Sequence, residues 1–213
     1  MFFIMNYDAV IVASGKGERA KLGYNKVFYR MSDGRSVLEH AASLFVEDED
    51  CKKIVIVTNR ENFDEVFSNE KVVLTVGGQE RKDSVGNGLK LCESEYVFIH
   101  DGARPFLDRR MLEKLKDKVV EDKAVILGRY AIDTIKIVEN EKIVKTIDRN
   151  KVFLAETPQA FDRKLIEDCY ERCEDIVFTD DASLAESLGY TVSVVNDEYE
   201  NRKLTKEEDF RGL

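Results

Sequence analysis

Short apolar runs alternate with amphipathic stretches along most of this chain. Six runs rich in valine and isoleucine have the length and flanking residues of buried strands, and they cover residues 8–14, 53–59, 72–76, 96–101, 124–128 and 191–196. Between them, apolar residues recur at helical spacing within 37–45, 111–119 and 165–169. This alternation predicts a Rossmann-like three-layer α/β sandwich with a mainly parallel sheet, whose ligands bind at the carboxyl ends of the strands.

Residues 133–147 break this alternation. Two stretches with alternating apolar and polar positions flank Glu139-Asn140-Glu141, which is the pattern of a β-hairpin. A lone hairpin is marginally stable unless something packs on it, so we expect a protruding arm at about 133–150 that a partner subunit covers in a homodimer. No repeat or linker interrupts the rest, which predicts a single domain over 1–213.

Composition narrows the function classes. The 213 residues are 43% hydrophobic, enough for a real core, and carry a formal net charge of -9. Such a surface repels polyanions, which argues against nucleic acid and anionic membranes, so a phosphate-bearing substrate would need a locally basic cleft. The apolar start Phe2-Phe3-Ile4-Met5 is too short for a signal peptide or a membrane span, so we expect a cytoplasmic protein, with Met1 and Met5 both open as the start of translation. The four cysteines form no CxxC pair, which argues against a disulfide or metal role.

A glycine-rich turn follows the first predicted strand. In Ser14-Gly15-Lys16-Gly17-Glu18-Arg19-Ala20, the bare backbone can come close to phosphate oxygens. The turn also satisfies G-x-G-x-x-A, so a nicotinamide-dependent oxidoreductase is an alternative. No acidic residue ends the second strand at the expected distance, and Arg19 and Lys26 add two cations that a dinucleotide turn does not need. These cations favour a triphosphate.

Two further polar turns follow strands, at residues 77–85 and 100–105. An aspartate at a strand end can ligate Mg²⁺, which prefers carboxylate and phosphate oxygens, so Asp101 is the metal candidate. His100, beside this carboxylate, and His40, on an amphipathic helix, are both interpreted as structural.

Local signals mark the second half of the chain. The two prolines predict shaped loops at residues 103–105 and 157–159. Residues 179–183 open a helix, with Asp180 as a capping residue and either capping or ligand binding open for Asp181. Thr205-Lys206-Glu207-Glu208 is typical of a capping box.

Five separated motifs occur together in one order. They are the glycine-rich turn with Arg19 and Lys26, residues 77–84, residues 100–105, Asp133-Thr134 with Asp148-Arg149-Asn150, and Thr157-Pro158-Gln159; residues 179–183 and Lys203 extend the set. In these motifs the chain resembles the 2-C-methyl-D-erythritol 4-phosphate cytidylyltransferases. That family is homodimeric and uses CTP and Mg²⁺ to form CDP-methylerythritol and pyrophosphate in the non-mevalonate route to isoprenoids.

The resemblance implies a role for each matching residue. It implies catalytic cations at Arg19, Lys26, Arg149 and Lys203. It implies CTP contacts at Ala13, Ser14, Gly15, Gly17, Gly78, Gln79 and Ser84. It implies acceptor contacts at Asp101, Gly102, Arg104, Thr134, Arg149 and Thr157, with Mg²⁺ at Asp101 and with Thr134 and Arg149 reaching the neighbouring subunit's site.

The chain departs from the family pattern at a few positions. Ser14 replaces an alanine, Asn25 and Val27 flank the lysine in place of proline and glutamine, Gln79 stands where aspartate is common, and the chain stops soon after Phe210. None of these changes removes a proposed charge. Two alternatives stay open beside the nicotinamide enzyme: ribitol-5-phosphate cytidylyltransferase, which differs in its acceptor, and a nucleotide-binding regulator without catalysis.

Overall fold

A seven-stranded sheet forms the centre of the molecule. In the computed structural model, which describes residues 5–15, 17–174 and 176–213, its strand order is β3-β2-β1-β4-β8-β5-β9. The strands are β1 (Tyr7–Val12), β2 (Cys51–Thr58), β3 (Val72–Val76), β4 (Tyr96–Asp101), β5 (Ala124–Tyr130), β8 (Phe153–Asp162) and β9 (Ser193–Asn196). All neighbours pair in parallel except β8, which runs antiparallel to β4 and β5. The six predicted strands are confirmed with ends shifted by at most two residues, whereas residues 1–4 of the apolar start lie outside the described part.

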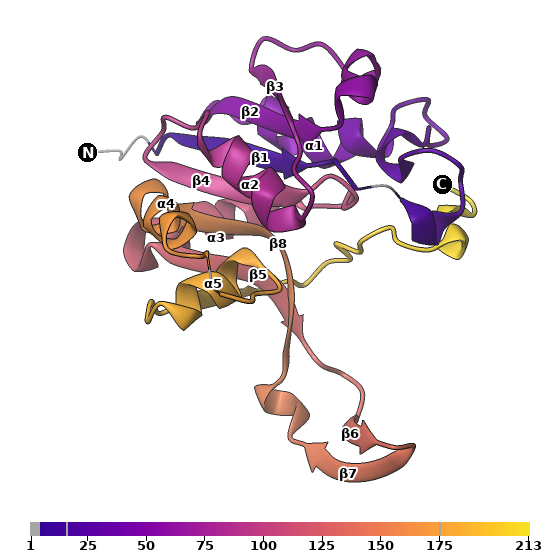
Figure 1. The fold of residues 1–213 in the computed structure, drawn as a ribbon, viewed down its shortest axis with the longest axis vertical. Helices are drawn as coiled ribbons and strands as arrows, with labels where there is room; N and C mark the ends of the chain where they lie inside the picture. The colour runs from indigo at the N-terminus through magenta and orange to yellow at the C-terminus, as the bar shows by residue number, and fades with distance from the viewer. Residues whose placement is uncertain (1–4, 16, 175) are drawn as a thin grey trace.

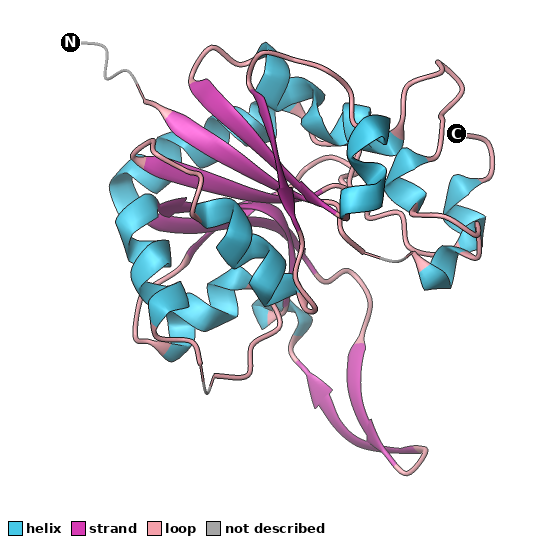
Figure 2. Cartoon of the chain, turned by 45° about the horizontal axis from the view of Figure 1, so that its top comes forward, coloured by secondary structure: helices cyan, strands magenta, loops and turns pink. Residues whose placement is uncertain are grey.

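Helices cover both faces of this sheet (Figures 1 and 2). On one face, α1 (Val37–Glu47) and α3 (Arg109–Asp122) pack in one hydrophobic cluster. On the other, α2 (Arg81–Leu89), α4 (Arg163–Glu171) and α5 (Asp181–Ser187) pack in a second. The predicted three-layer sandwich is therefore confirmed. Short 3₁₀ helices supplement it: η1 (Glu18–Ala20), η2 (Lys26–Phe28), η3 (Arg60–Glu65), η4 (Arg149–Lys151) and η5 (Glu207–Phe210).

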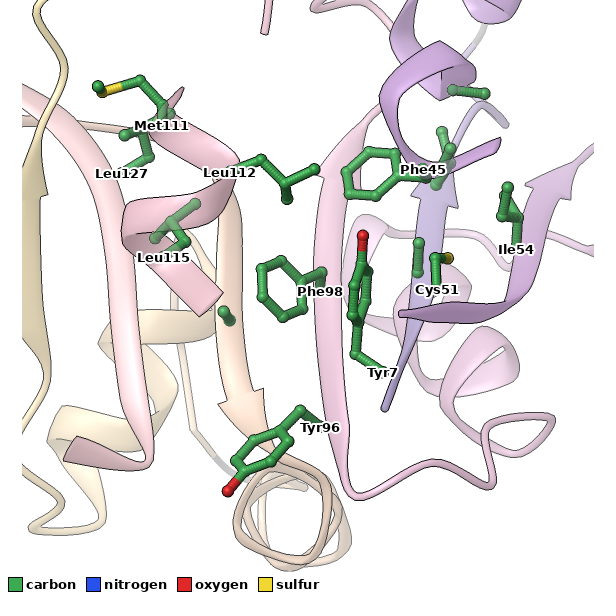
Figure 3. Packing of buried hydrophobic residues seen from close by; sticks show 14 of the residues in the cluster. Tyr7, Phe45, Cys51, Ile54, Tyr96, Phe98, Met111, Leu112, Leu115 and Leu127 are labelled. Atoms are coloured by element: carbon green, nitrogen blue, oxygen red, sulfur yellow. The ribbon is translucent and has the colours of Figure 1, made fainter. Parts of the chain in front are cut away.

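The first cluster is built around an aromatic group. The rings of Tyr7 and Phe98 lie 4.3 Å apart between centroids, and Phe45 meets Tyr7 edge-on (Figure 3). The Tyr7 hydroxyl donates a 2.9 Å hydrogen bond to Asp48, so its burial leaves no polar group unpaired. This packing fixes β1 and β4, two of the strands whose ends carry candidate site residues. Among the described residues, no helix has the length and apolar character needed to cross a bilayer.

Two local predictions are wrong. Thr157-Pro158-Gln159 lies within β8 rather than in a loop. The β5–β8 register shifts between Ile126 and Gly128, so Pro158 falls where the ladder is irregular and no donor is required of it. The N-cap of η5 is Lys206 rather than Thr205, and the Asp209 carboxylate accepts from the backbone N–H groups of both residues.

The predicted hairpin is confirmed. Strands β6 (Ile135–Glu139) and β7 (Lys142–Ile147) form a separate two-stranded sheet that stands away from the main one (Figure 1). The turn residues Asn140 and Glu141 both have positive φ, at 47° and 61°, as the common two-residue hairpin turn requires. Apolar side chains of the arm remain exposed, including Ile143 at 66% and Val144 at 57%.

Candidate active site

A cavity of about 820 Å³ opens beside the carboxyl ends of β1 and β4. It lies between the glycine-rich turn and the beginning of α2, where an α/β fold is expected to bind ligands. Eleven of the predicted site residues line it: Ala13, Ser14, Gly15, Gly17, Arg19, Lys26, Gly78, Gln79, Ser84, Asp101 and Lys203. The fold thus gathers residues from four separate motifs around one space.

The glycine-rich turn is held so that Lys26 reaches this cavity. Gly17 has φ of 69°, and a Cβ there would lie 3.1 Å from the Lys26 nitrogen, so glycine is required. Asn25 is buried; its Nδ2 donates to the Ala13 carbonyl at 2.6 Å and its Oδ1 accepts from the Val27 N–H at 3.3 Å. The departure at Asn25 therefore supplies its own turn structure and leaves Lys26 on the cavity wall.

The opposite wall is formed where α2 begins. The Gly78 N–H donates to Ser84 Oγ at 3.0 Å, and Ser14 Oγ lies 3.0 Å from the same oxygen. A Cβ at Gly78 would approach Asp83 Cβ to 2.1 Å, so the backbone comes close to the helix only because this residue is glycine. Ser14, another departure from the family pattern, thus contacts a residue expected to bind the nucleotide.

Asp101 is surrounded by cations at the end of β4. Its Oδ2 lies 2.8 Å from Lys203 Nζ and 3.5 Å from Arg104 Nε, and its Oδ1 lies 3.8 Å from Arg81 Nε. Burial alone would raise the pKa of Asp101, but Lys203 and Arg81 outweigh it and hold that pKa well below its usual range. Asp101 is therefore an anion at every physiological pH.

The charged form of Lys26, in contrast to that of Asp101, is disfavoured by its surroundings. Burial is the largest influence on its pKa, and the positive charges of Lys203 and Arg19 add to it, so that the pKa of Lys26 falls to about 8. Asp101 offsets only part of this effect. Cations that gather around one cavity closely enough to lower the pKa of Lys26 suit an anion with several charges, such as a polyphosphate.

Other predicted residues lie behind the cavity and support it. The Asp101 N–H donates to Thr157 Oγ1 at 3.0 Å, and that oxygen lies 3.1 Å from His100 Nδ1. His100 Nε2 donates to the Arg104 carbonyl at 3.1 Å, so Thr157 donates to Nδ1 of a neutral ring. Burial lowers the pKa of His100 to about 4, in keeping with its structural interpretation. Gly102, equally buried, donates its N–H to the Val12 carbonyl at 2.9 Å.

Two predicted residues lie away from the cavity. Thr134 and Arg149 belong to the arm, and Arg149 Nη1 donates to the Ile132 carbonyl at 2.6 Å. Neither residue lines the cavity of its own subunit. For these two residues to act at such a cavity, the arm of a second subunit would have to approach it.

Arg81 lines the cavity but was missed as a site residue. Its Nη2 donates to Asp181 Oδ2 at 2.7 Å, and the Tyr170 hydroxyl donates to Asp181 Oδ1 at 2.6 Å. Asp181 is therefore a buried partner of Arg81, which answers the question left open for it, while Asp180 caps α5 as predicted. The residue that holds Arg81 in place is Asp181, 100 positions away in the sequence, and no local sequence pattern links the two residues. Asn25, Glu18 and Glu80 also line the cavity without having been predicted.

The residues fit a divalent ion only in a limited way. Among the described residues, no group of three histidine, cysteine or acidic side chains could hold a metal. Asp101 offers one deprotonated carboxylate on the cavity wall. Because Mg²⁺ commonly binds through one or two carboxylates together with phosphate oxygens and water, this residue fits an ion whose other ligands come from a substrate.

Known proteins resemble the chain over nearly its whole length. The family model for 2-C-methyl-D-erythritol 4-phosphate cytidylyltransferase matches residues 7–212. Curated relatives of that name from Halalkalibacterium halodurans and Geobacillus thermodenitrificans are 39% and 40% identical, each over 96% of this chain and 94% of the relative. The crystal structure of a 2-C-methyl-D-erythritol 4-phosphate cytidylyltransferase from Francisella tularensis superposes on this chain with a TM-score of 0.84 at 28% identity, covering 96% of each chain. The crystal structure of 4-diphosphocytidyl-2C-methyl-D-erythritol synthase from Anaerococcus prevotii superposes with a TM-score of 0.85 at 30% identity, covering 98% of this chain and 96% of the other.

Proposed function

The chain belongs to the family of 2-C-methyl-D-erythritol 4-phosphate cytidylyltransferases, and from this premise we propose how its residues carry out the reaction. It is a nucleotidyltransferase that moves CMP from CTP to 2-C-methyl-D-erythritol 4-phosphate, forming CDP-methylerythritol and pyrophosphate. An oxygen of the acceptor's phosphate attacks the α-phosphorus of CTP, and the bond to the β-phosphate oxygen breaks. Such a transfer needs little covalent help from the protein and depends on positioning and charge.

The observation that carries the assignment of roles is the group of cations around one cavity. Arg19, Lys26 and Lys203 would bind the triphosphate and stabilise the charge that grows on the α-phosphoryl oxygens and on pyrophosphate. The backbone of the glycine-rich turn would approach the phosphates, and Gly78 and Ser84 would contact the cytosine edge. Gln79 lies beside them on the same wall and would contribute a further nucleotide contact.

The acceptor would bind beside Asp101. Its carboxylate can accept hydrogen bonds from the acceptor's hydroxyl groups, since Lys203 and the arginines around it keep it ionised. Thr157 and Gly102 would fix the backbone that carries it, and Arg104 would hold it from behind. When bound, Mg²⁺ would supply further positive charge near the triphosphate, with Asp101 as its protein ligand.

The arm would complete the site across a dimer. Its apolar side chains lie exposed within one subunit, and a hairpin of two strands is not expected to hold its shape unsupported. In a twofold dimer, each arm would cover the other and carry Thr134 and Arg149 to the partner's acceptor site. We propose that the protein is a cytoplasmic homodimer whose subunit is a single domain.

A pyrophosphate-release assay tests this function. With CTP, we expect turnover with 2-C-methyl-D-erythritol 4-phosphate and far less with ribitol 5-phosphate, and UTP should replace CTP poorly. Excess EDTA, or the substitution Asp101→Asn, should abolish release. Preference for ribitol 5-phosphate would transfer the assignment to the alternative acceptor, and full activity in EDTA would remove the metal from the proposal.

A further inference from the structure

Two buried carboxylates behind the site have oxygens without a hydrogen-bond partner. Glu156 in β8 is 5% exposed and Asp197 after β9 is 7% exposed. Among the described residues, Oε2 of Glu156 and Oδ2 of Asp197 are unpartnered, as is Oδ1 of Asn201 in the same segment. Buried oxygens are nearly always paired, so these two carboxylates require an explanation.

Both residues flank the same point of β5. The Gly128 carbonyl accepts from the Asp197 N–H, and Gly128 also pairs with Ala155, the residue before Glu156. Asp197 Oδ1 is already occupied by the Tyr199 N–H at 2.8 Å, which leaves Oδ2 for another partner. Both residues therefore lie near Gly128, and the Asp197 side chain lies within hydrogen-bonding reach of Glu156.

Two arginines lie near the Glu156 carboxylate, but neither makes a close contact with it. Arg104 Nη1 lies 3.8 Å from Oε2, and Arg129 Nε lies 3.5 Å from Oε1, so neither satisfies the carboxylate with a well-formed hydrogen bond. Burial raises the pKa of Glu156 above its usual range, and Asp197 raises it further, in spite of Arg104 and Arg129. A proton on Glu156 would relieve the repulsion between the two acids.

We propose that Glu156 is protonated in the folded enzyme, that its hydroxyl donates to the Asp197 carboxylate, and that this bond makes Glu156 a positioning residue for the segment that carries Lys203. One proton then accounts for both unpartnered carboxylate oxygens. It also removes one negative charge from the vicinity of Arg104, which is left to pair with Asp101.

The segment that follows Asp197 leads directly into the active site. Arg104 Nη1 donates to the Asn201 carbonyl at 2.7 Å, and Asn201 Nδ2 donates to the Thr157 carbonyl at 2.8 Å. Two residues later, Lys203 Nζ lies 2.8 Å from Asp101. Glu156 and Asp197 therefore anchor the beginning of the segment that presents Lys203. The effect on the position of Lys203 rests on the proposed function. The proton between Glu156 and Asp197 does not, because it can be measured without substrate.

The proton itself can be observed by carbon NMR of the enzyme labelled at glutamate side-chain carboxyls. We expect one glutamate to titrate above the ordinary value of about 4.3, and this signal to be missing in Glu156→Gln. Glu200→Gln, an exposed glutamate of the same segment, should leave the signal unchanged. The proposal is refuted if every glutamate of the wild type titrates at its ordinary pH.

Stability as a function of pH gives a second measurement. A folded state that holds this proton above the unfolded glutamate's pKa is stabilised at low pH, and the stabilisation is lost as the pH rises through the folded pKa. Glutamine cannot ionise and still donates an N–H to Asp197. The urea midpoint of Glu156→Gln should therefore rise relative to wild type between pH 5 and pH 8. Parallel curves for the two proteins would contradict the proposal.

The positioning role is tested by kinetics. Glu156→Gln should keep kcat within about twofold, whereas Glu156→Leu, which leaves Asp197 without a donor, should lower kcat about tenfold with the dissociation constant of CTP little changed. Rescue by glutamine but not by leucine separates positioning through this bond from mere filling of space. An equal loss in both variants would refute the role. A wild type without turnover would instead refute the proposed function and leave the proton measurement intact.

Discussion

Raising the pH from 7 to 9 should weaken CTP binding about tenfold, because Lys26 loses its charge over this range. Burial and the neighbouring charges of Lys203 and Arg19 lower the pKa of Lys26 to about 8. About nine in ten molecules of the free enzyme then carry charged Lys26 at pH 7, about half at pH 8 and about one in ten at pH 9. Since the phosphates bind the charged form, the apparent dissociation constant should rise in proportion to its loss.

The same reasoning predicts proton uptake. Bound phosphates lie next to Lys26 and restore its charge, so CTP binding at pH 8 should take up about half a proton. Isothermal titration calorimetry in two buffers with different heats of ionisation measures this number directly. Phosphate monoesters release their second proton near pH 6, so the nucleotide itself contributes little at pH 8.

Substitutions separate Lys26 from other titrating groups. Lys26→Arg keeps its charge to high pH, so its CTP binding should lose the pH dependence and the proton uptake even if its affinity is lower throughout. Lys26→Ala should lower turnover by roughly two to three orders of magnitude with an unchanged circular dichroism spectrum. Lys164→Arg, an exposed lysine on α4, should behave as the wild type does. Equal proton uptake by Lys26→Arg and the wild type would show that another group titrates.

Two further predictions concern the dimer and the fold. Lys26→Ala and Arg149→Ala homodimers should each be nearly inactive. Unfolding and refolding the two variants together should restore roughly a quarter of wild-type activity, because a mixed dimer places both lesions in one site and leaves the other site intact. If a mixture shown by mass spectrometry to contain heterodimers recovers no activity, Arg149 serves the site of its own subunit. Lys116 is 8% exposed, with Nζ 3.1 Å from Asp48, so Lys116→Met should lower the free energy of unfolding by about 3–5 kcal/mol by leaving the buried Asp48 carboxylate without its cation, measured by urea unfolding. A loss no larger than that of Lys118→Met, a control at an exposed ion pair on the same helix, would refute this reasoning.

The strands and most helices followed from apolar periodicity, and the failures have physical causes. β8 was missed because a proline in its middle argues against a strand, and only the partner strand shows that the ladder is irregular there. α2 was missed because its sequence contains two glycines and few apolar residues. A Cβ at Gly88 would lie 2.5 Å from Val10 Cγ1, so glycine is selected by close approach to the sheet rather than by helix propensity. Contacts between distant segments therefore outweigh local preference in both elements.

The site was predictable where chemistry is local and hidden where it is not. The glycine-rich turn and the strand-end aspartate carry their own signals, and the structure brings both to one cavity. Arg81 gave no signal because its partners Asp181 and Asp101 lie far from it in sequence. The carboxyl pair of Glu156 and Asp197 is of the same kind, since neither residue is unusual until the sheet places them together.

The charge of Lys203 acts on two other residues of the cavity, Lys26 and Asp101. It lowers the pKa of Lys26 by repulsion and that of Asp101 by attraction, so the same ammonium group disfavours charge on one neighbour and favours it on the other. Removing Lys203 would therefore make Lys26 a better cation while it weakens the hold on Asp101. Substitutions at Lys26 and Lys203 should consequently not add: the loss of turnover in the double variant should be larger than the two single losses combined, because in the Lys203 single variant the more fully charged Lys26 offsets part of the loss, and the double variant lacks this offset. Combined losses that add would instead mean that each lysine acts on the substrate alone, with no effect on its neighbour.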